Sequence, residues 1–363
     1  MDFTPSPSQQ LLIATARDVL RRHYSPETAQ RLALDDHGFD EPLWRRMAEL
    51  GWPGLLVPGE LGGSDGSLLD VILLVEEMGR AGLAGPFVTS AVVSTSLLLA
   101  GSGSPPRDRL LVALASGERI ATLAMTEESG ASAPADLAMR CGVPGRLTGT
   151  KLLVKDAHVA TDLIVVLHGG ELLLLPGDRD GIARLPLDTL SGEKLFEVTF
   201  DAVDVRAEDR LPGGAAALAH ALTAGALART AEMVGAAQRV LDLAVEHAKT
   251  RVQGGRPIGA YQAIQHACAD LVRDVDTSRG LLYLAAWKVS EALPAAADVA
   301  TAKAYASEAC LTVARRGHQI FGAIGYCEEH PLHLLHKRVQ AAGVDYGSIG
   351  DHLETVARSI GLS

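Results

Sequence analysis

The spacing of apolar residues in the first part of the chain is that of amphipathic helices. Ser6, Pro7 and Gln9 have the pattern of a helix start, in which a serine cap, a first-turn proline and a glutamine satisfy the free backbone groups. An apolar stripe at helical spacing follows them. Further helices are predicted at residues 41–50, 67–80 and 86–100, and a breaker is predicted at residues 102–107.

From about residue 119 to residue 212 the pattern changes to short runs of β-forming residues. Turns of Gly, Asp and Pro separate these runs, and no helix long enough for a crossover lies between them. The pattern therefore predicts an antiparallel β domain and not a doubly wound sheet. The runs are residues 120–126, 148–154, 161–167, 171–175 and 195–203.

From about residue 214 onward the periodicity is helical again. Three long helices and two shorter ones are typical of a helical bundle. They are predicted at residues 214–252, 260–292, 295–321, 331–340 and 349–360. We therefore expect three domains, at residues 1–118, 119–213 and 214–363.

Length and composition support a large folded protein. The chain has 363 residues, of which 47% are hydrophobic and 21% charged, so it is not a disordered chain. A formal charge of −11 makes nucleic acid or an anionic membrane a poor partner. Aromatic residues make up only 4%, while Ala, Leu and Gly dominate, and this favours closely packed helices.

Cysteine usage and the N-terminus favour a soluble protein of the reducing cytoplasm. No two cysteines form a CxxC pair, no basic flank with an apolar core opens the chain, and charges interrupt every long apolar stretch. The cysteines are Cys141, Cys268, Cys310 and Cys327. His330, His333 and His336 form HxxHxxH, but a spacing of three drifts around a helix, so we expect no metal there.

Five segments, in order, resemble the acyl-CoA dehydrogenase family over nearly the whole chain. The resemblance implies an N-terminal helical domain, a middle antiparallel β-barrel domain and a C-terminal four-helix bundle. It also implies FAD and a tetramer built from dimers. The segments are LGWPGLLVPGELGGSDGSLLDVILLVEEMGR (50–80), AMTEES (124–129), GTKLLVKDA with ATDLIVV (149–166), RVQGGRPIGAYQAIQH (251–266) and QIFGAIGYCEEHPLH (319–333).

The resemblance assigns FAD contacts at the bundle. Arg251 matches the arginine of the family's RxQFG motif, which contacts the pyrophosphate, and a guanidinium suits that group because its donors form a fixed fork. Gln262, eleven residues on, matches a second FAD contact. Gln319, Gly322 and Ala323 match the family's QxxGG segment, which meets the adenine end of FAD in another subunit.

Further positions face the flavin in the family. Thr126 and Ser132 match hydroxyl residues near the flavin and the thioester, and Ser348 matches a cofactor contact. The family's tryptophan and phenylalanine are replaced by Leu153 and Gly254, so the packing around the flavin is expected to differ.

The family's catalytic glutamate is absent from both of its known places. Tyr346 and Gly225 stand there. Asp345 is the nearest carboxylate and the candidate base, although a solvated aspartate at a helix start is the competing interpretation. Tyr346 could orient the substrate, but a tyrosine hydroxyl has an ordinary pKa of about 10 and is a poor base at neutral pH.

Three functions follow from the resemblance. The first is an FAD-dependent acyl-CoA dehydrogenase that desaturates an acyl-CoA thioester and passes electrons to an electron-transfer flavoprotein. The resemblance suggests a bulky, branched or sterol-derived acyl group. The second is a base-lacking subunit of a heteromeric dehydrogenase, which supplies half of an FAD site. The third is a flavoenzyme of other chemistry, such as a monooxygenase or nitroalkane oxidase. The expected assembly is a homotetramer or a heterotetramer with a related subunit.

Overall fold

A computed structural model of the protein describes residues 4–131, 133–142 and 145–362. The chain forms two compact units, which we name the helical unit and the sheet unit. The helical unit comprises Met1–Arg31, Leu68–Leu83 and Ala226–Ser363, and the sheet unit comprises Leu32–Ser67 and Ala84–Gly225. Parts of the N-terminal region therefore pack with the C-terminal helices, and the domain boundaries expected at residues 118 and 213 stay a prediction.

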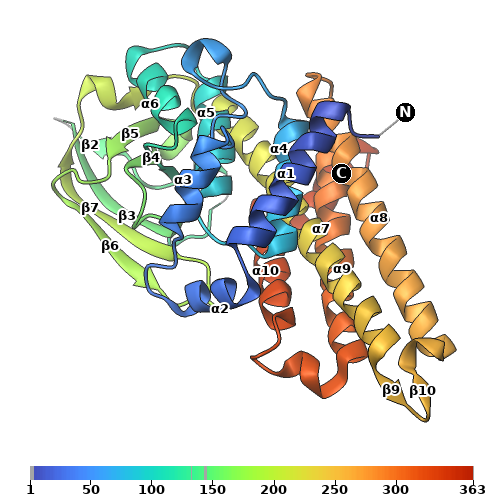
Figure 1. The fold of residues 1–363 in the computed structure, drawn as a ribbon. Helices are drawn as coiled ribbons and strands as arrows, with labels where there is room; N and C mark the ends of the chain where they lie inside the picture. The colour runs from blue at the N-terminus through green and yellow to red at the C-terminus, as the bar shows by residue number, and fades with distance from the viewer. Residues whose placement is uncertain (1–3, 132, 143–144, 363) are drawn as a thin grey trace. The chain divides into compact units, whose positions relative to one another are not determined.

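The helical unit contains most of the long helices, and α8, α9 and α10 lie beside one another in it (Figure 1). Helix α1 begins with the predicted capping box, because Ser6 and Gln9 exchange side-chain and backbone hydrogen bonds. Helix α7 continues into this unit from the sheet unit. The helices are α1 (Pro7–His23), α4 (Leu68–Ala81), α7 (Gly214–Thr250), α8 (Gln262–Ser290), α9 (Ala296–Phe321), α10 (Leu332–Val344) and α11 (Ile349–Ser359), with the short hairpin β9 (Val252–Gln253) and β10 (Arg256–Pro257) between α7 and α8.

Helices α4 and α7 approach each other closely through glycine. A Cβ placed on Gly235 would lie 1.9 Å from the carbonyl oxygen of Glu76, and one on Gly79 would lie 2.3 Å from that of Glu232. Only glycine leaves room for the facing backbone at such a crossing. The close helix packing expected from the composition is present here.

The sheet unit contains two four-stranded sheets, in the orders β1-β4-β5-β8 and β2-β3-β7-β6. One apolar cluster joins side chains from both sheets, including Leu147, Leu163, Leu173 and Phe200. Each predicted run contains a strand. The strands are β1 (Ala121–Ala124), β2 (Cys141–Gly142), β3 (Arg146–Lys155), β4 (Asp162–Val166), β5 (Leu172–Pro176), β6 (Ile182–Leu187), β7 (Leu195–Asp204) and β8 (Arg210–Leu211).

Two features of the sheets differ from the expectation. Strand β1 pairs with β4 in parallel, because the chain runs through β2 and β3 of the other sheet before it returns. The remaining pairs in these two sheets are antiparallel. Strand β6 was not predicted, and neither were the two-residue strands β2 and β8. Strand β6 contains Pro186 but lies at the edge of its sheet, where a proline is tolerated.

The breaker predicted at residues 102–107 is wrong in its second half, where a helix of the sheet unit begins. Helix α6 begins within it, with Pro105 in its first turn, where the missing N–H has no partner to lose. The predicted helix at 86–100 begins as a buried π-helix, Phe87–Ser94, and continues as α5. Helix α2 (Pro26–Leu34), which lies partly in this unit, was not predicted. The other helices are α3 (Glu41–Glu49), α5 (Thr95–Ala100) and α6 (Pro105–Ala115).

The fold class expected from the sequence is confirmed, with helical N- and C-terminal regions around a middle β-sheet region. No helix within the described residues is long and apolar enough to cross a membrane.

Candidate functional site

The candidate base lies in the segment of residues 345–348, which connects α10 to α11. Asp345 follows the last residue of α10, and Ser348 caps α11. Tyr346 has a φ of +55° and Gly347 a φ of +109°, so the chain turns sharply here. The left-handed conformation is uncommon for a tyrosine, and surrounding contacts must hold it.

The Asp345 carboxylate pairs with a buried arginine of α7. Arg229 is 5% exposed, and its Nη2 lies 2.7 Å from Oδ2 of Asp345. The same guanidinium also pairs with Glu232, one turn further along α7. Two carboxylates therefore neutralise one buried cation, as a buried charge requires. That Asp345 is the base stays a prediction, and its carboxylate is not an isolated solvated group.

Tyr346 and Gly347 are held from α11. The backbone oxygen of Tyr346 accepts a hydrogen bond from Nε2 of His352, at 3.1 Å, so that nitrogen carries the proton. Burial, with Lys303 nearby, lowers the pKa of His352. A Cβ on Gly347 would lie 2.6 Å from the His352 ring, so glycine is required at this turn.

Ser348 has a structural partner of its own. Its hydroxyl lies 2.7 Å from Oδ2 of Asp351 and accepts the N–H of that residue at 3.3 Å, which completes a capping box for α11. Hydrogen bonds from Ser348 lower the pKa of Asp351. The predicted cofactor contact at Ser348 would therefore be made by a residue that also starts a helix.

Arg251 and Gln262 lie at the far end of α7 and α8, on either side of the β9–β10 hairpin (Figure 1). Both side chains are exposed. Among the described residues, neither side chain has a hydrogen-bond or ion-pair partner. Their polar groups are thus available to a ligand.

Gln319, Gly322 and Ala323 lie where α9 ends. Gln319 and Ala323 are exposed. Gly322 has a φ of +65°, and nothing lies within 4 Å of the position a Cβ would take, so its backbone is open to close approach. His247 of α7 stacks on Phe321 of α9 at 4.5 Å, which places the ends of these two helices together.

The residues at this end of the bundle fit FAD. An unpaired guanidinium suits a pyrophosphate, and exposed amide side chains beside an open glycine backbone suit the polar rest of a dinucleotide. Helix α10 spans about 20 Å, since each of its residues rises about 1.5 Å, and separates this end from the segment of residues 345–348. The structure therefore brings together Arg251 and Gly322, and it does not bring either to Asp345.

In the sheet unit, Thr126 follows β1 and is half-buried, and its backbone oxygen accepts from the N–H of Leu152 at 2.8 Å. Ser132 lies outside the described residues. Leu153, in the bulge of β3, has a φ of +55° and is 53% exposed, so an apolar side chain is presented where the family carries tryptophan. In the helical unit, the hydroxyl of Tyr261 lies 2.5 Å from the position that a Cβ on Gly254 would take. It therefore occupies the space in which the side chain of the family's phenylalanine would begin.

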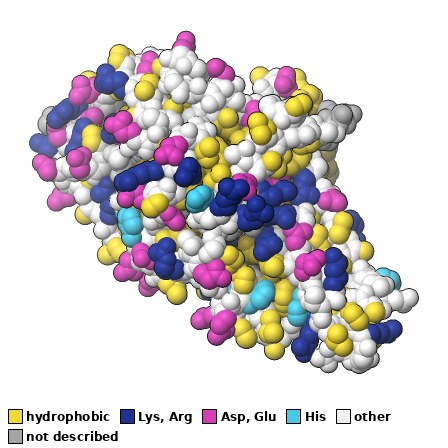
Figure 2. Space-filling view, viewed as in Figure 1, with side chains coloured by type: hydrophobic (Ala, Val, Ile, Leu, Met, Phe, Trp, Pro, Cys, Tyr) yellow, Lys and Arg dark blue, Asp and Glu magenta, His cyan; other side chains and the backbone are white. Residues whose placement is uncertain are grey.

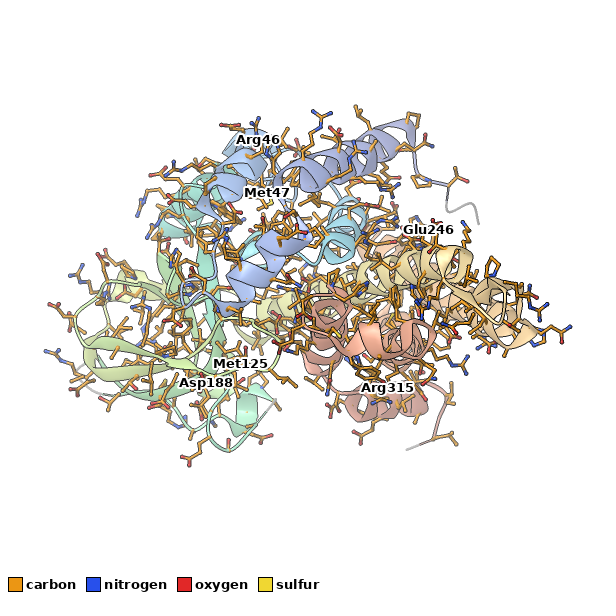
Figure 3. The ribbon with its side chains drawn as sticks, turned by 60° about the horizontal axis from the view of Figure 1, so that its bottom comes forward. Arg46, Met47, Met125, Asp188, Glu246 and Arg315 are labelled. Carbon is orange, nitrogen blue, oxygen red and sulfur yellow. The ribbon has the colours of Figure 1, made fainter. Side chains whose placement is uncertain are left out.

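A buried ion pair fixes the loop after β1, and sequence reasoning missed it. Lys151, which is fully buried, places Nζ 2.6 Å from Oε1 of Glu127 and donates to the backbone oxygen of Met125 at 3.0 Å (Figure 3 labels Met125). Glu127 also accepts from the backbone N–H groups of Ala138 and Met139. Burial lowers the pKa of Lys151. For Glu127 burial acts to raise the pKa, but the bonds from Lys151 and the two N–H groups outweigh it and lower it. No spacing rule in the sequence links these residues.

A cavity of about 200 Å³ in the helical unit is lined by charged residues that are already paired. Arg17 binds Glu77 at 2.6 Å, Arg279 binds Glu76 at 2.8 Å, and Arg80 binds Asp242 at 2.5 Å. Figure 2 shows a group of basic side chains near the centre of one face, with acidic side chains around it. This cavity therefore does not favour a separate anion site. Within the described part of the chain, no group of three or more His, Cys, Asp or Glu residues could hold a metal ion.

Comparison with known proteins gives matches along both ends of the chain. Residues 6–118 match the family model of the acyl-CoA dehydrogenase N-terminal domain, and residues 213–361 match that of the C-terminal domain. The acyl-CoA dehydrogenase IpdE2 of Mycobacterium tuberculosis is 30% identical, over 94% of this chain and 93% of its own. A chain of the ChsE4-ChsE5 complex from the same organism matches with a TM-score of 0.92 and 29% identity, over 100% of this chain and 100% of its own length. A chain of a Tcur3481-Tcur3483 steroid ACAD variant matches with a TM-score of 0.88 and 27% identity, over 97% of this chain and 97% of its own length.

Proposed function

Because this chain belongs to the acyl-CoA dehydrogenase family, we propose that it serves the FAD-dependent α,β-desaturation of an acyl-CoA thioester. Bound FAD supplies the acceptor for the hydride that leaves the β-carbon, and an electron-transfer flavoprotein takes the electrons onward. The observation that carries this proposal is the set of exposed, unpartnered polar side chains beside the open backbone of Gly322.

In this proposal the bundle end holds the cofactor. Arg251 would bind the pyrophosphate with its fork of donors, and Gln262 would donate from the first turn of α8. The remaining contacts would come from hydroxyl, amide and backbone groups. Those at the end of α9 would meet the adenine part of FAD in a second subunit. They are Thr126, Ser132, Gln319, Gly322, Ala323 and Ser348.

Asp345 is the proposed base, with Tyr346 orienting the thioester. To accept the α-proton, the Asp345 carboxylate would give up its contact with Arg229. Glu232 pairs with the same guanidinium and would keep it neutralised during that step. The exchange therefore leaves no buried cation without a partner.

A second candidate function is that of a base-lacking subunit in a heteromeric dehydrogenase. The observation in its favour is that the family's two glutamate positions hold Tyr346 and Gly225, while the nearest carboxylate is bound to Arg229. Similarity to the ChsE4-ChsE5 complex, which is named for two chains, supports it. In that assembly this chain would contribute FAD contacts, and a related chain would contribute the glutamate.

We further propose a bulky substrate, branched or sterol-derived, and a cytoplasmic location. Similarity to a steroid ACAD supports the substrate class. Leu153 supports it as well, since it is smaller than the tryptophan it replaces and leaves more room beside the flavin.

The test is to purify the chain alone, record its flavin spectrum, and add acyl-CoAs with an artificial electron acceptor. Asp345→Asn removes the candidate base, and Asp298→Asn is the matched control, because it removes a carboxylate of the same unit that pairs with Lys288 and not with Arg229. Flavin bleaching that is lost in Asp345→Asn and kept in Asp298→Asn supports the first function. Bleaching that requires a second, glutamate-bearing chain and is unchanged in Asp345→Asn supports the second. A chain that binds no flavin, alone or with that partner, refutes both.

A further inference from the structure

Lys303 is a fully buried lysine of α9 whose side-chain nitrogen binds the end of another helix. Its Nζ donates to the backbone oxygens of Ala342 at 2.6 Å and Gly343 at 3.0 Å. The hydroxyl of Ser307 lies 3.4 Å from the same nitrogen and 3.2 Å from the oxygen of Gly343, and its nearest acceptor is the backbone oxygen of Lys303 at 2.7 Å. Both carbonyls belong to the last turn of α10.

Helix ends explain why a hydrogen-bond donor is placed there. The last four carbonyl groups of a helix have no partner within it, and the helix dipole puts partial negative charge at that end. Buried carbonyls without a donor are costly, as is a buried ammonium without acceptors. Lys303 satisfies both needs at once, although it lies 39 residues from Ala342 in the chain.

We propose that Lys303 is a positioning residue, whose bonds to the last turn of α10 fix the place of Asp345 and Tyr346. The chain leaves α10 at Val344 and enters the segment of residues 345–348 directly. Three cationic or imidazole groups from three helices then hold this stretch, namely Lys303 from α9, Arg229 from α7 and His352 from α11. The positioning of that segment does not depend on the proposed function, whereas its effect on turnover does.

The charged and titratable groups around Lys303 set how it responds to pH. Arg229 and His352 face it from α7 and α11, Asp345 from the segment of residues 345–348, and Cys310 from α9 itself. Burial lowers the pKa of Lys303 to about 7, Arg229 adds to this, and Asp345 and Cys310 oppose it.

The direction of the pH effect follows by linkage. When the end of α10 opens, Lys303 is solvated and its pKa returns toward about 10.4. The open form then binds a proton that the closed form lacks between about pH 7 and pH 10. Opening therefore becomes less favourable as the pH rises through this window.

Hydrogen exchange of a peptide spanning residues 338–350 tests the proposal without any need for activity. In the wild type, protection of these amides should rise with pH between 7.5 and 9, by at most about tenfold per unit, after correction for intrinsic exchange. Lys303→Met removes the ammonium donor from both carbonyls, leaves Gly343 only the more distant Ser307 hydroxyl, and should reduce protection by roughly tenfold. Lys303→Gln keeps N–H donors but does not titrate, so it should retain more protection than Lys303→Met and lose the pH dependence.

Lys288→Met is the matched control, since Lys288 pairs with Asp298 away from α10 and its loss should leave this peptide unchanged. Unchanged protection in Lys303→Met, or a pH dependence that persists in Lys303→Gln, would overturn the proposal. Activity is a separate measurement on the flavin-loaded oligomer. There we expect kcat to fall more than KM rises in Lys303→Met, with a pH profile altered near 7. An inactive wild type that shows the expected exchange would overturn the first proposed function and leave the positioning role intact.

Discussion

The buried pair of Lys151 and Glu127 offers a direct test of how the sheet unit holds its loop. Replacing Lys151 with methionine keeps the length and apolar stem of the side chain and removes only the ammonium. Glu127 then stays buried, with two backbone N–H donors but without its counter-charge.

The expected loss can be sized from the burial of both groups. Lys151 is 0% exposed and Glu127 8% exposed, so water cannot replace the missing partner. Removing one member of a buried ion pair destabilises a protein by about 3–5 kcal/mol. Lys155→Met is the matched control, because Lys155 lies further along β3 and its Nζ is 3.6 Å from Glu193. That partly exposed contact should contribute less than about 1 kcal/mol.

Equilibrium unfolding in urea, followed by tryptophan fluorescence, measures the change. Trp44 and Trp52 are buried in the same unit as Lys151 and report on its unfolding. The double variant Lys151→Met with Glu127→Gln should lose less than the sum of the single losses, since neither charge is then left alone. Because the pKa of Glu127 is lowered, its contribution is present above the ordinary carboxyl range and is lost as the pH falls through the folded pKa. A loss below about 1 kcal/mol in Lys151→Met, or strict additivity in the double variant, would refute the argument.

Three further predictions concern the helical unit. Gly235→Ala places a Cβ 1.9 Å from the carbonyl oxygen of Glu76 and should lower the free energy of unfolding by about 3 kcal/mol in the same urea assay. Gly280→Ala is the control, since the described residues leave open space there, and it should be neutral or stabilising. Arg251→Gln should weaken FAD binding roughly 10- to 100-fold in a flavin titration, while Arg273→Gln on the same bundle should leave it unchanged. Burial lowers the pKa of four clustered histidines. As the pH falls below about 6.5, the unfolded chain therefore binds more protons than the folded chain does. Thermal stability should drop between about pH 6.5 and 5 for this reason. His336→Phe should reduce that drop, and an identical pH dependence in the variant would contradict the assignment. The four are His247, His318, His330 and His336.

Much of the element pattern was predictable from short stretches of sequence. The capping box at Ser6, the three long helices after residue 213 and the five predicted β runs depend on residues within a few positions of one another. The misses have local causes too. Pro186 hid an edge strand, and Pro105 was taken for a breaker although it lies in a first helical turn.

The candidate site was predictable only in part. The motif carrying Arg251 and Gln262, and the segment carrying Gly322, pointed to residues that are exposed and open in the structure. The Asp345 partner was not foreseen, because Arg229 lies on a different helix, more than a hundred residues earlier.

The sequence by itself determined the order of helical and β regions, most of the long helices and strands, and the family to which the chain belongs. These properties follow from periodicity, capping and motif spacing, which act over a few neighbouring residues. The tertiary structure alone decided that β1 pairs with β4 in parallel, that Arg229 binds Asp345, and that Lys303 binds the end of α10. Such contacts join residues far apart in the chain, and in the helical unit close crossings at Gly79 and Gly235 help to set the distances between helices. A buried charge then takes whichever partner the packed helices bring within reach.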